Sequence, residues 1–310
     1  MSSLENIKTL RELTGAGLKD CKTALAENND DMDAAVDWLR KKGIVTAAKK
    51  SSRAASEGMV AAGISANMQK GVLLEVNCET DFVARTDGFK GFVSELSGHI
   101  LANNPADIEE LKTQSWTHDV STSVDNVLSS MVHKTGENVQ LRRFVTLQGG
   151  YVSQYIHAGS RLGVLLSVDC DASQNGNEDF QSFVEDICMH IAANRPQFVS
   201  DAEIPEEVVQ KEMEIQVSRS MEDDKFKGKP KDIVEKAVSG RIAKWKKEIS
   251  LLNQLFDEDT KATVEKCVAD KSKEFGFGFS LKSFVVFELG EGLEKRKDNF
   301  AEEVAAMTQQ

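Results

Sequence analysis

The sequence of 310 residues contains little that would announce an enzyme. It has five cysteines, an odd number, and none stands in a CxxC pair, so neither a disulfide framework nor a thiolate zinc site is indicated. Its five histidines lie far apart, and the sequence has no GxxxxGKS/T loop, HExxH helix or GxSxG turn. These absences exclude the commonest phosphate-loop, metallohydrolase and serine-hydrolase sites. A reducing cytosol, with the cysteines as small core residues, fits best.

Long apolar runs are also missing. Phe284–Phe287 is among the longest, and it is far too short to cross a bilayer. Met1 leads directly into a charged amphipathic segment without the apolar core of a secretory signal. This start favours a cytoplasmic location.

Positive charge is in deficit. Acidic residues outnumber basic ones by 50 to 38, which gives a net charge of −12. General binders of nucleic acid or anionic membranes rely on Lys and Arg to neutralise phosphate, so these classes are disfavoured. The stretch from Arg40 to Arg53 is a local exception, with six basic residues among small ones. It is either a nucleic-acid contact or a helix end followed by a solvated linker. The linker is favoured, and we expect no direct nucleic-acid or membrane partner.

Residues 2–43 predict three short helices, because apolar residues recur there at helical spacing. The apolar positions are Leu4, Ile7 and Leu10 in the first helix, Leu18, Cys21, Ala24 and Leu25 in the second, and Met32, Ala35, Val36 and Leu39 in the third. A bundle of this size has a modest core. We expect it to be an appendage that presents one surface.

The middle of the chain contains a degenerate internal duplication. Gly71–Cys78 and Gly163–Cys170 are 92 positions apart, and each predicts the second strand of a β-hairpin with a five-residue connection. A helix of matching pattern follows each hairpin, with His99 and His190 at equivalent places 91 positions apart. Two copies of a hairpin packed by a helix predict an α+β fold. Since both copies carry the cysteine and the histidine, we interpret these residues as fold requirements rather than as a disulfide or a metal site.

Residues 205–252 predict a helical hairpin that projects from the body, with its turn at Lys227–Pro230. The apolar residues are Val209, Met213, Val217 and Met221 in the first arm, and Val234, Val238, Ile242, Trp245, Ile249 and Leu252 in the second. Their spacings of three and four are typical of an antiparallel coiled-coil seam. Beyond it, Ser280–Leu289 predicts a returning strand and Asn299–Met307 a terminal amphipathic helix.

One feature breaks the repeat. After Cys78 the first copy continues with Glu79, Thr80, Asp81, Phe82 and Val83, whereas the second copy has a plain polar loop at this place. Phe82 is therefore either a local plug of the core or an exposed anchor for a pocket on a partner. In the second case Asp81 is a nearby charge or a helix cap.

At these residues the sequence resembles the bacterial elongation factor Ts family, whose members are guanine-nucleotide exchange factors for elongation factor Tu. The resemblance covers essentially the whole chain. It is carried by the segments Leu13–Gly17 with Asp20–Lys22, Glu75–Ala84, Gly136–Asn138, Arg142–Arg143, His157–Val164 and Phe287–Glu294.

The resemblance implies an N-terminal three-helix module similar to ubiquitin-associated domains, a core of two related subdomains, a coiled-coil protrusion and a C-terminal module. The boundaries that we predict are 1–55 for the N-terminal module with its basic linker, 56–139 for the first core subdomain, 140–204 for the second, 205–252 for the inserted coiled coil, 253–290 for the rest of the second subdomain, and 291–310 for the C-terminal module.

The same resemblance implies a site. Thr80, Asp81, Phe82 and Val83 would enter the GTPase domain of elongation factor Tu near its magnesium ion and so promote release of GDP. The N-terminal module would touch the same domain, and the second subdomain would touch another domain of the partner. The residues of these secondary contacts are Leu18, Lys19, His157 and Gly159. No cofactor, bound metal or catalytic residue is implied.

Two departures from the family pattern stand out. Lys19 replaces a bulky apolar residue that the family often has after its Gly-Ala-Gly, and Leu255 stands where the family has proline, which loses a fixed φ. Self-association through the coiled coil stays open. Two other classes of function stay open as well: an RNA- or ribosome-associated protein that uses residues 40–53, and an enzyme with a site between the two repeats near His157 or His190.

Overall fold

The computed structural model describes residues 4–14, 16, 18–32, 34–39, 53–157, 159–222, 231–257 and 259–293. Four predicted features lie outside these residues: Gly15 and Gly17 of the N-terminal motif, the basic stretch up to residue 52, the 227–230 turn and the 299–307 helix. Within the described part of the chain, no helix is both long and apolar enough to cross a membrane.

The N-terminal residues form the helices that their spacing predicts. Helix α1 spans Leu4–Thr14, α2 spans Leu18–Glu27, and residues 34–39 are also helical. Their apolar sides meet in one small cluster, whose buried members are Ile7, Leu10, Ala16, Cys21, Ala24, Leu25, Ala35 and Leu39. This cluster is separate from the hydrophobic clusters of the other elements.

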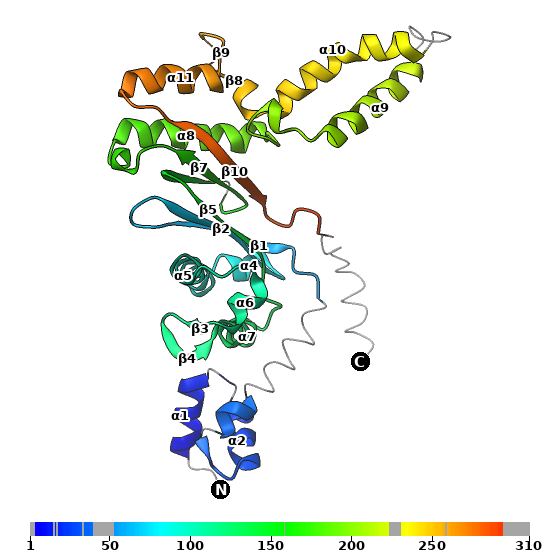
Figure 1. Ribbon diagram of the computed structural model, residues 1–310. Helices are drawn as coiled ribbons and strands as arrows, with labels where there is room; N and C mark the ends of the chain where they lie inside the picture. The colour runs from blue at the N-terminus through cyan, green and yellow to red at the C-terminus, as the bar shows by residue number, and fades with distance from the viewer. Residues whose placement is uncertain are drawn as a thin grey trace.

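The centre of the molecule has four layers, with two antiparallel sheets back to back and helices on both outer faces (Figure 1). The first sheet has the order β1-β2-β5, and the second has the order β10-β7-β6. The strands are β1 (Glu57–Ile64), β2 (Lys70–Cys78), β5 (Gln140–Gln148), β6 (Tyr151–His157), β7 (Leu162–Asp169) and β10 (Ser280–Glu288). Mixed helices and antiparallel sheets make this an α+β fold, as predicted.

Helices cover the outer face of each sheet. Helix α5 (Asp87–Asn103) lies on the first sheet and α8 (Glu178–Asn194) on the second, whereas α7 (Val124–Thr135) and α11 (Val264–Phe275) contribute to the same two cores from farther out (Figure 1). The smaller elements are α4 (Asp81–Ala84), α6 (Ile108–Thr113), β3 (Ser115–Trp116), β4 (Asp119–Ser123), β8 (Leu255–Asp257) and β9 (Ala262–Thr263), with single 3-10 turns at Ala172–Gln174, Asp201–Glu203 and Leu251–Asn253. Each sheet with its helices encloses a core of its own.

The sheets approach each other closely at two glycines. A Cβ on Gly71 would lie 2.8 Å from a side-chain carbon of Leu165, and one on Gly163 would lie 2.6 Å from a carbon of Val60. These glycines occupy equivalent places in the two copies. The third hydrophobic cluster of the body, which contains Val60, Leu73, Val152 and Leu165, fills the space between the sheets. The two copies therefore share one packed interface.

The duplication extends beyond the two hairpins and the helix that follows each of them. Helices α7 and α11 begin at Val124 and Val264, 140 positions apart, and both end at a left-handed glycine, Gly136 or Gly276. Strands β5 and β10 begin at 140 and 280, again 140 apart. Helices α5 and α8 begin at 87 and 178, only 91 apart, so the second copy contains 49 additional residues (140 − 91 = 49).

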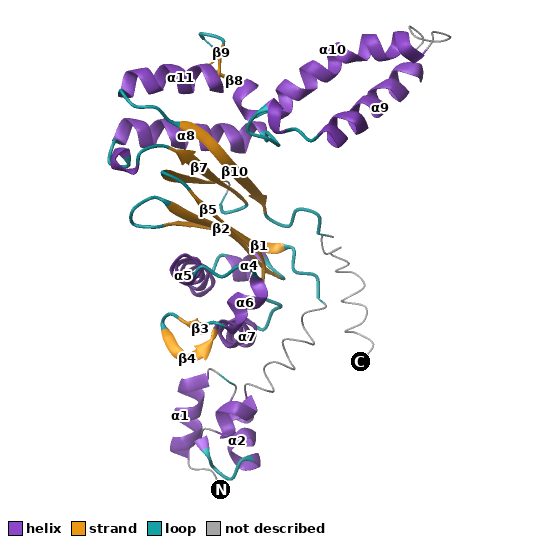
Figure 2. Ribbon diagram, in the orientation of Figure 1, coloured by secondary structure: helices purple, strands orange, loops and turns teal. Residues whose placement is uncertain are grey.

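The additional residues belong to a projecting helical hairpin, α9 (Glu206–Glu222) and α10 (Lys231–Ile249) (Figure 2). Val209, Val217, Val238, Ile242 and Ile249 are buried between or beside its helices. Two predicted seam positions differ. Met221 is 50% exposed, and its neighbour Ser220 is buried instead and accepts a hydrogen bond from Arg241. Leu252 packs against the second sheet's core, because the helix ends at Ile249.

Two other expectations change with the pairing of the strands. Strand β5 pairs with β2, so the predicted boundary between residues 139 and 140 cuts through the first sheet. This pairing gives the buried central strand a hydrogen-bonded neighbour on its second side. The connection of the second hairpin has four residues rather than five, because His157 remains in the strand and pairs with Leu162.

Candidate functional site

The segment that breaks the repeat forms a single helical turn, α4, directly after β2. Thr80 caps this turn in an extended conformation, and its side-chain oxygen accepts a hydrogen bond from the amide of Val83 at 3.4 Å. Val83 packs against the first sheet's core, whereas Phe82 is 80% exposed. The interpretation of Phe82 as a plug of the core is therefore wrong. The turn presents an aromatic ring to solvent.

Glu137, which follows α7, holds the residues just before this turn. Its Oε2 accepts hydrogen bonds from the amides of Glu79 at 3.1 Å and Thr80 at 3.0 Å, and its Oε1 accepts one from the Thr80 hydroxyl at 2.6 Å. In return, the Glu79 carboxylate accepts the amide of Asn138 at 2.7 Å. In the sequence, Glu137 stands in the Gly136–Asn138 segment of the family resemblance, and no local pattern there indicates this role.

Asp81 begins α4 and faces Arg85 one turn later, with 2.8 Å between carboxylate and guanidinium. Both side chains are well exposed, so this pair contributes less than about 1 kcal/mol to stability. The carboxylate is therefore held weakly and is accessible to a partner.

A hollow joins Asp81 to the second copy. It has a volume of about 410 Å³ and is lined by Asp81 and Arg85 on one side and by Gly159 and Arg161 of the β6–β7 turn on the other. Arg161 forms an ion pair with Glu57 at 3.0 Å, which ties this turn to β1. Gly159 has a φ of +65°, a conformation that favours glycine. Two of the predicted contact residues, Asp81 and Gly159, thus line one surface.

His157 lies at the end of β6 and does not line this hollow. Its ring is exposed, stacks on Tyr155 with 5.7 Å between centroids, and shares a hydrogen bond of 2.8 Å between Nδ1 and the tyrosine hydroxyl. Leu18 and Lys19 are both exposed at the start of α2, on the separate N-terminal bundle. The predicted residues therefore divide into the α4 turn, the β6–β7 end and the N-terminal helices.

Three motifs that carried the family resemblance meet at one buried charge. Glu75 on β2 is fully buried and accepts hydrogen bonds from Arg142 at 3.0 Å, Arg143 at 2.7 Å and the amide of Gly290 at 2.9 Å. The Arg143 guanidinium also lies 4.1 Å from the centre of the Phe287 ring. Burial alone raises the pKa of Glu75, but these hydrogen bonds outweigh it and hold the pKa below its ordinary value. The cluster fastens the end of β10 to the first sheet.

His99 and His190 play equivalent structural parts in the two copies. His99 contacts Gln114 at 3.1 Å and His190 contacts Gln254 at 2.9 Å. Burial lowers the pKa of both imidazoles. Their interpretation as fold requirements fits these contacts. Among the described residues, no group of three or more His, Cys, Asp or Glu side chains is placed to hold a metal ion.

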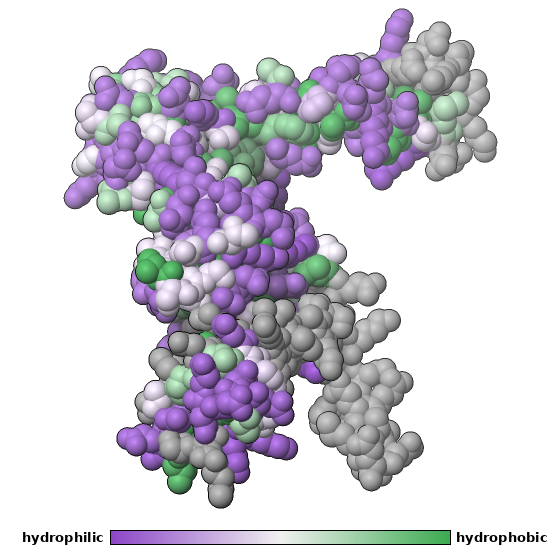
Figure 3. Space-filling view, turned by 60° about the horizontal axis from the view of Figure 1, so that its bottom comes forward, coloured by the Kyte–Doolittle hydropathy of each residue, from purple (hydrophilic) through white to green (hydrophobic). Residues whose placement is uncertain are grey.

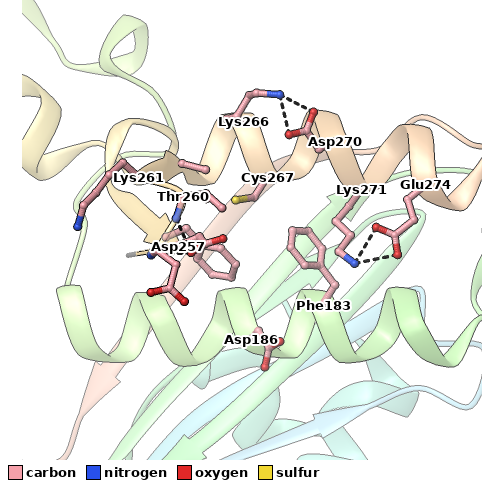
Figure 4. Close-up of a pocket in the computed structure, with 13 residues that line it drawn as sticks. Phe183, Asp186, Asp257, Thr260, Lys261, Lys266, Cys267, Asp270, Lys271 and Glu274 are labelled. Carbon is pink, nitrogen blue, oxygen red and sulfur yellow. Dashed lines mark hydrogen bonds and ion pairs between the residues drawn. The ribbon is translucent and has the colours of Figure 1, made fainter.

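A larger hollow of about 850 Å³ lies on the second copy between α8, α11 and the β8–β9 turn (Figure 4). Ion pairs between Lys266 and Asp270 and between Lys271 and Glu274 lie along it, and Phe183 and Cys267 contribute to its lining. Burial raises the pKa of the Cys267 thiol, which opposes a nucleophilic role. This hollow lies outside the interface between the two copies and contains no histidine, so it does not match the site expected for an enzyme.

The face of the molecule drawn in Figure 3 has few wide apolar areas among its described residues. Figure 3 shows a predominantly hydrophilic face with hydrophobic residues in small patches. Among the described residues, the large apolar side chains that are most exposed are Leu4, Phe82 and Val120. An isolated apolar side chain is ordinary on a protein surface, so Phe82 is distinguished by its rigid setting rather than by exposure alone.

The sequence of this chain is similar to those of known elongation factors. Residues 79–291 match the family model described as Elongation factor TS. The chain is 46% identical over 303 residues to elongation factor Ts of Trichlorobacter lovleyi, with 97% of this chain and 96% of that protein covered. It is 42% identical over 309 residues to elongation factor Ts of Clostridium perfringens, with 99% of each covered. It is 41% identical over 303 residues to that of Halothermothrix orenii, with 97% of each covered.

Proposed function

This chain belongs to the elongation factor Ts family, and we propose that it releases GDP from elongation factor Tu by inserting the α4 turn beside the magnesium site of that GTPase. The family implies a nucleotide exchange factor of translation elongation, which is not a catalytic enzyme in the usual sense. The proposal concerns how this chain performs that exchange and which of its residues do so.

The observation that carries the proposal is the setting of Phe82. The ring is 80% exposed, yet the backbone on either side is held by the Thr80 cap and by Val83 in the core. An exposed aromatic on a rigid turn loses little conformational entropy when it binds. Transfer of the ring into a pocket supplies about 2 to 3 kcal/mol.

The free energy gained by burying the Phe82 ring is of the size that faster GDP release requires. A GTPase holds its nucleotide through a phosphate loop and a magnesium ion. An exchange factor has only to bind the nucleotide-free GTPase better than the GDP-bound GTPase. Factor and nucleotide then lower each other's affinity for the GTPase. A thousandfold faster release corresponds to a dissociation barrier lower by about 4 kcal/mol. Phe82 would shift the helices beside the ion while Asp81 perturbs the ligands of the ion by charge or hydrogen bonding.

The secondary contacts follow from the same proposal. Gly159 lines the hollow beside Asp81, so the β6–β7 turn with His157 would meet a second domain of elongation factor Tu next to the α4 turn. Leu18 and Lys19 would meet the GTPase domain through the N-terminal helices. Both nucleotide-free and GDP-bound elongation factor Tu are partners in this scheme.

The finer organisation is also part of the proposal. The N-terminal helices would form a module similar to ubiquitin-associated domains, and α9 with α10 a coiled coil able to support self-association. Two related subdomains make up the core, with the first extended to the end of β5 because that strand pairs with β2. The proposed place of action is the cytoplasm.

Stopped-flow release of a fluorescent GDP from a matched elongation factor Tu, with and without this chain, tests the proposal. We expect a strong acceleration that depends on the concentration of the chain. No acceleration by the folded chain would refute it. Salt-sensitive RNA binding without binding to elongation factor Tu would favour the alternative based on residues 40–53.

A further inference from the structure

The segment before the α4 turn carries backbone donors that the sheet does not use. Cys78 is the last residue of β2 that pairs with β1, so the amides of Glu79 and Thr80 lie beyond the ladder. Backbone amides removed from water need an acceptor. The Glu137 carboxylate accepts both amides through Oε2 and the Thr80 hydroxyl through Oε1.

This acid departs from the repeat together with the segment that it holds. The position equivalent to Glu137, 140 residues later, is Phe277, which packs with its ring centre 5.3 Å from that of Phe180. The loop equivalent to the α4 segment begins at Asp171, whose carboxylate accepts the amide of Ser173 in its own turn at 2.9 Å. Within the described ranges, the copy with the exposed Phe82 is the only one in which an acid far away in sequence binds the start of the turn.

The hydrogen bonds of Glu137 affect Phe82 through Thr80. The hydroxyl of Thr80 donates a hydrogen bond to the Glu137 carboxylate and accepts one from the amide of Val83. One group therefore orients the first turn of the helix that carries Phe82. The Phe82 ring is 80% exposed, so its direction depends mainly on this backbone. Hydrogen bonds to a carboxylate are stronger than those between neutral groups.

A second set of hydrogen bonds holds Glu137 itself in place. Its amide is a donor to the Thr135 hydroxyl at 3.2 Å, and it follows Gly136, the left-handed cap of α7. The backbone amide of the next residue, Asn138, donates a hydrogen bond to the Glu79 carboxylate. The two segments thus exchange hydrogen bonds in both directions, which sets the distance between them.

We propose that Glu137 is a positioning residue for nucleotide exchange, which holds the Thr80–Phe82 segment in the geometry that elongation factor Tu receives. This inference rests on the proposed function and deepens it. Glu137 acts through Thr80 rather than by touching the nucleotide or its magnesium ion. A misplaced binding element costs about tenfold to hundredfold in efficiency, and we expect a loss in this range for Glu137→Ala.

The test measures GDP release from elongation factor Tu as kcat/KM for the wild-type chain, Glu137→Ala, Glu137→Gln and the control Asp171→Ala. We expect Glu137→Ala to lose about tenfold or more and Glu137→Gln to retain part of the activity, because its amide oxygen still accepts a backbone amide. Asp171→Ala alters the equivalent loop of the second copy and should leave the rate unchanged. Equal rates for Glu137→Ala and wild type would overturn the inference.

Two further readouts separate positioning from general stability. Hydrogen exchange should speed up at the amides of Glu79 and Thr80 in Glu137→Ala but not at Leu74 in the middle of β2. In a double-mutant cycle, Thr80→Val should cost less in the Glu137→Ala chain than in the wild type, because their shared hydrogen bond is already lost. Full additivity, or loss of protection throughout β2, would overturn the inference. A wild-type chain that releases no GDP would refute the proposed function itself, whatever the variants do.

Discussion

Phe82 and Val83 are neighbours in sequence but have different surroundings, since Phe82 is exposed and Val83 packs against the first sheet's core. The sequence indicated that this segment was special because it broke the repeat, but it left open whether the aromatic residue faced inward or outward. Direction depends on where the turn begins, and that is set by Thr80 as cap and by Glu137, 57 positions away (137 − 80 = 57). A contact between residues so far apart in sequence has no local signature.

Replacement of Phe82 by alanine should separate activity from stability. Because the ring is already exposed, the free energy of unfolding should change by less than about 0.5 kcal/mol. The exchange rate should fall by about tenfold or more, since the ring's burial against the partner is lost. Stopped-flow GDP release and urea unfolding measure the two effects.

Val120→Ala is a matched control, because Val120 is 79% exposed and belongs to β4, which lies apart from α4 in Figure 1. It should leave both quantities unchanged. An exchange rate for Phe82→Ala equal to that of the control would contradict the role of Phe82.

Glu75 gives a prediction about pH. Its pKa is lowered in the folded chain, so the stability that it contributes is present above its ordinary pKa of about 4.5 and is lost as the pH falls through the lowered value. Urea unfolding at a series of pH values below 5 should show this loss in the wild type.

Glu75→Gln should be less stable by about 3 kcal/mol at pH 7, because the buried pair with Arg142 and Arg143 loses its acid. Its stability should also fall less steeply below pH 4.5 than that of the wild type. Equal slopes for the two chains would show that Glu75 does not carry the acid dependence.

At the level of elements, the long strands and helices were predictable because their apolar periods are regular. The internal repeat directly predicted strand β2 and helix α5, together with their equivalents in the second copy, β7 and α8. The short strand pairs β3–β4 and β8–β9 were not predicted. Strands β3, β8 and β9 have only two or three residues each, which is too short to show an alternating pattern. The 140-residue spacing that relates the later elements was hidden by the inserted hairpin.

The hairpin is inserted where its two ends meet. The amide of Gln197 donates to the carbonyl of Ile249 at 2.8 Å, and the amide of Leu252 donates to the carbonyl of Val199 at 2.9 Å. Val199 and Leu251 are buried in the second core, as Ile108 and Leu111 lie in or against the first. The latter two stand three residues apart on α6.

Removal of residues 200–250, with two glutamates in their place, should therefore leave a folded core. Val199 and Leu251 would then have the spacing of Ile108 and Leu111. We expect cooperative thermal unfolding with a midpoint within about 5 °C of the full chain. Circular dichroism during heating measures it. A broad, non-cooperative transition would mean that the hairpin is required for the second copy to fold.

At the level of the whole molecule, the sequence predicted two related units but not the way in which they pack. Back-to-back packing depends on which face of each sheet is left uncovered by its helices, and central strands buried on both faces do not show this by their period. The close approach at Gly71 and Gly163 became interpretable only when both residues were seen to face the opposite sheet.

Binding of the whole chain should depend on the nucleotide held by its partner. If the chain weakens the affinity of elongation factor Tu for GDP by a given factor, GDP must weaken the affinity for the chain by the same factor. Calorimetric titrations of GDP-bound and nucleotide-free elongation factor Tu measure it. The same affinity for both forms would contradict the exchange mechanism, and Phe82→Ala should reduce the difference between them.

The packed interface between the two sheets also fixes the distance between the α4 turn and the β6–β7 turn. The α4 turn stands on one sheet and the β6–β7 turn on the other, and the glycine contacts leave little room for the sheets to slide. A partner that touches both turns must bring its two surfaces to one set separation. The chain would then select partners by the relative orientation of their domains, and a partner whose domains are turned apart would meet only one of the two turns.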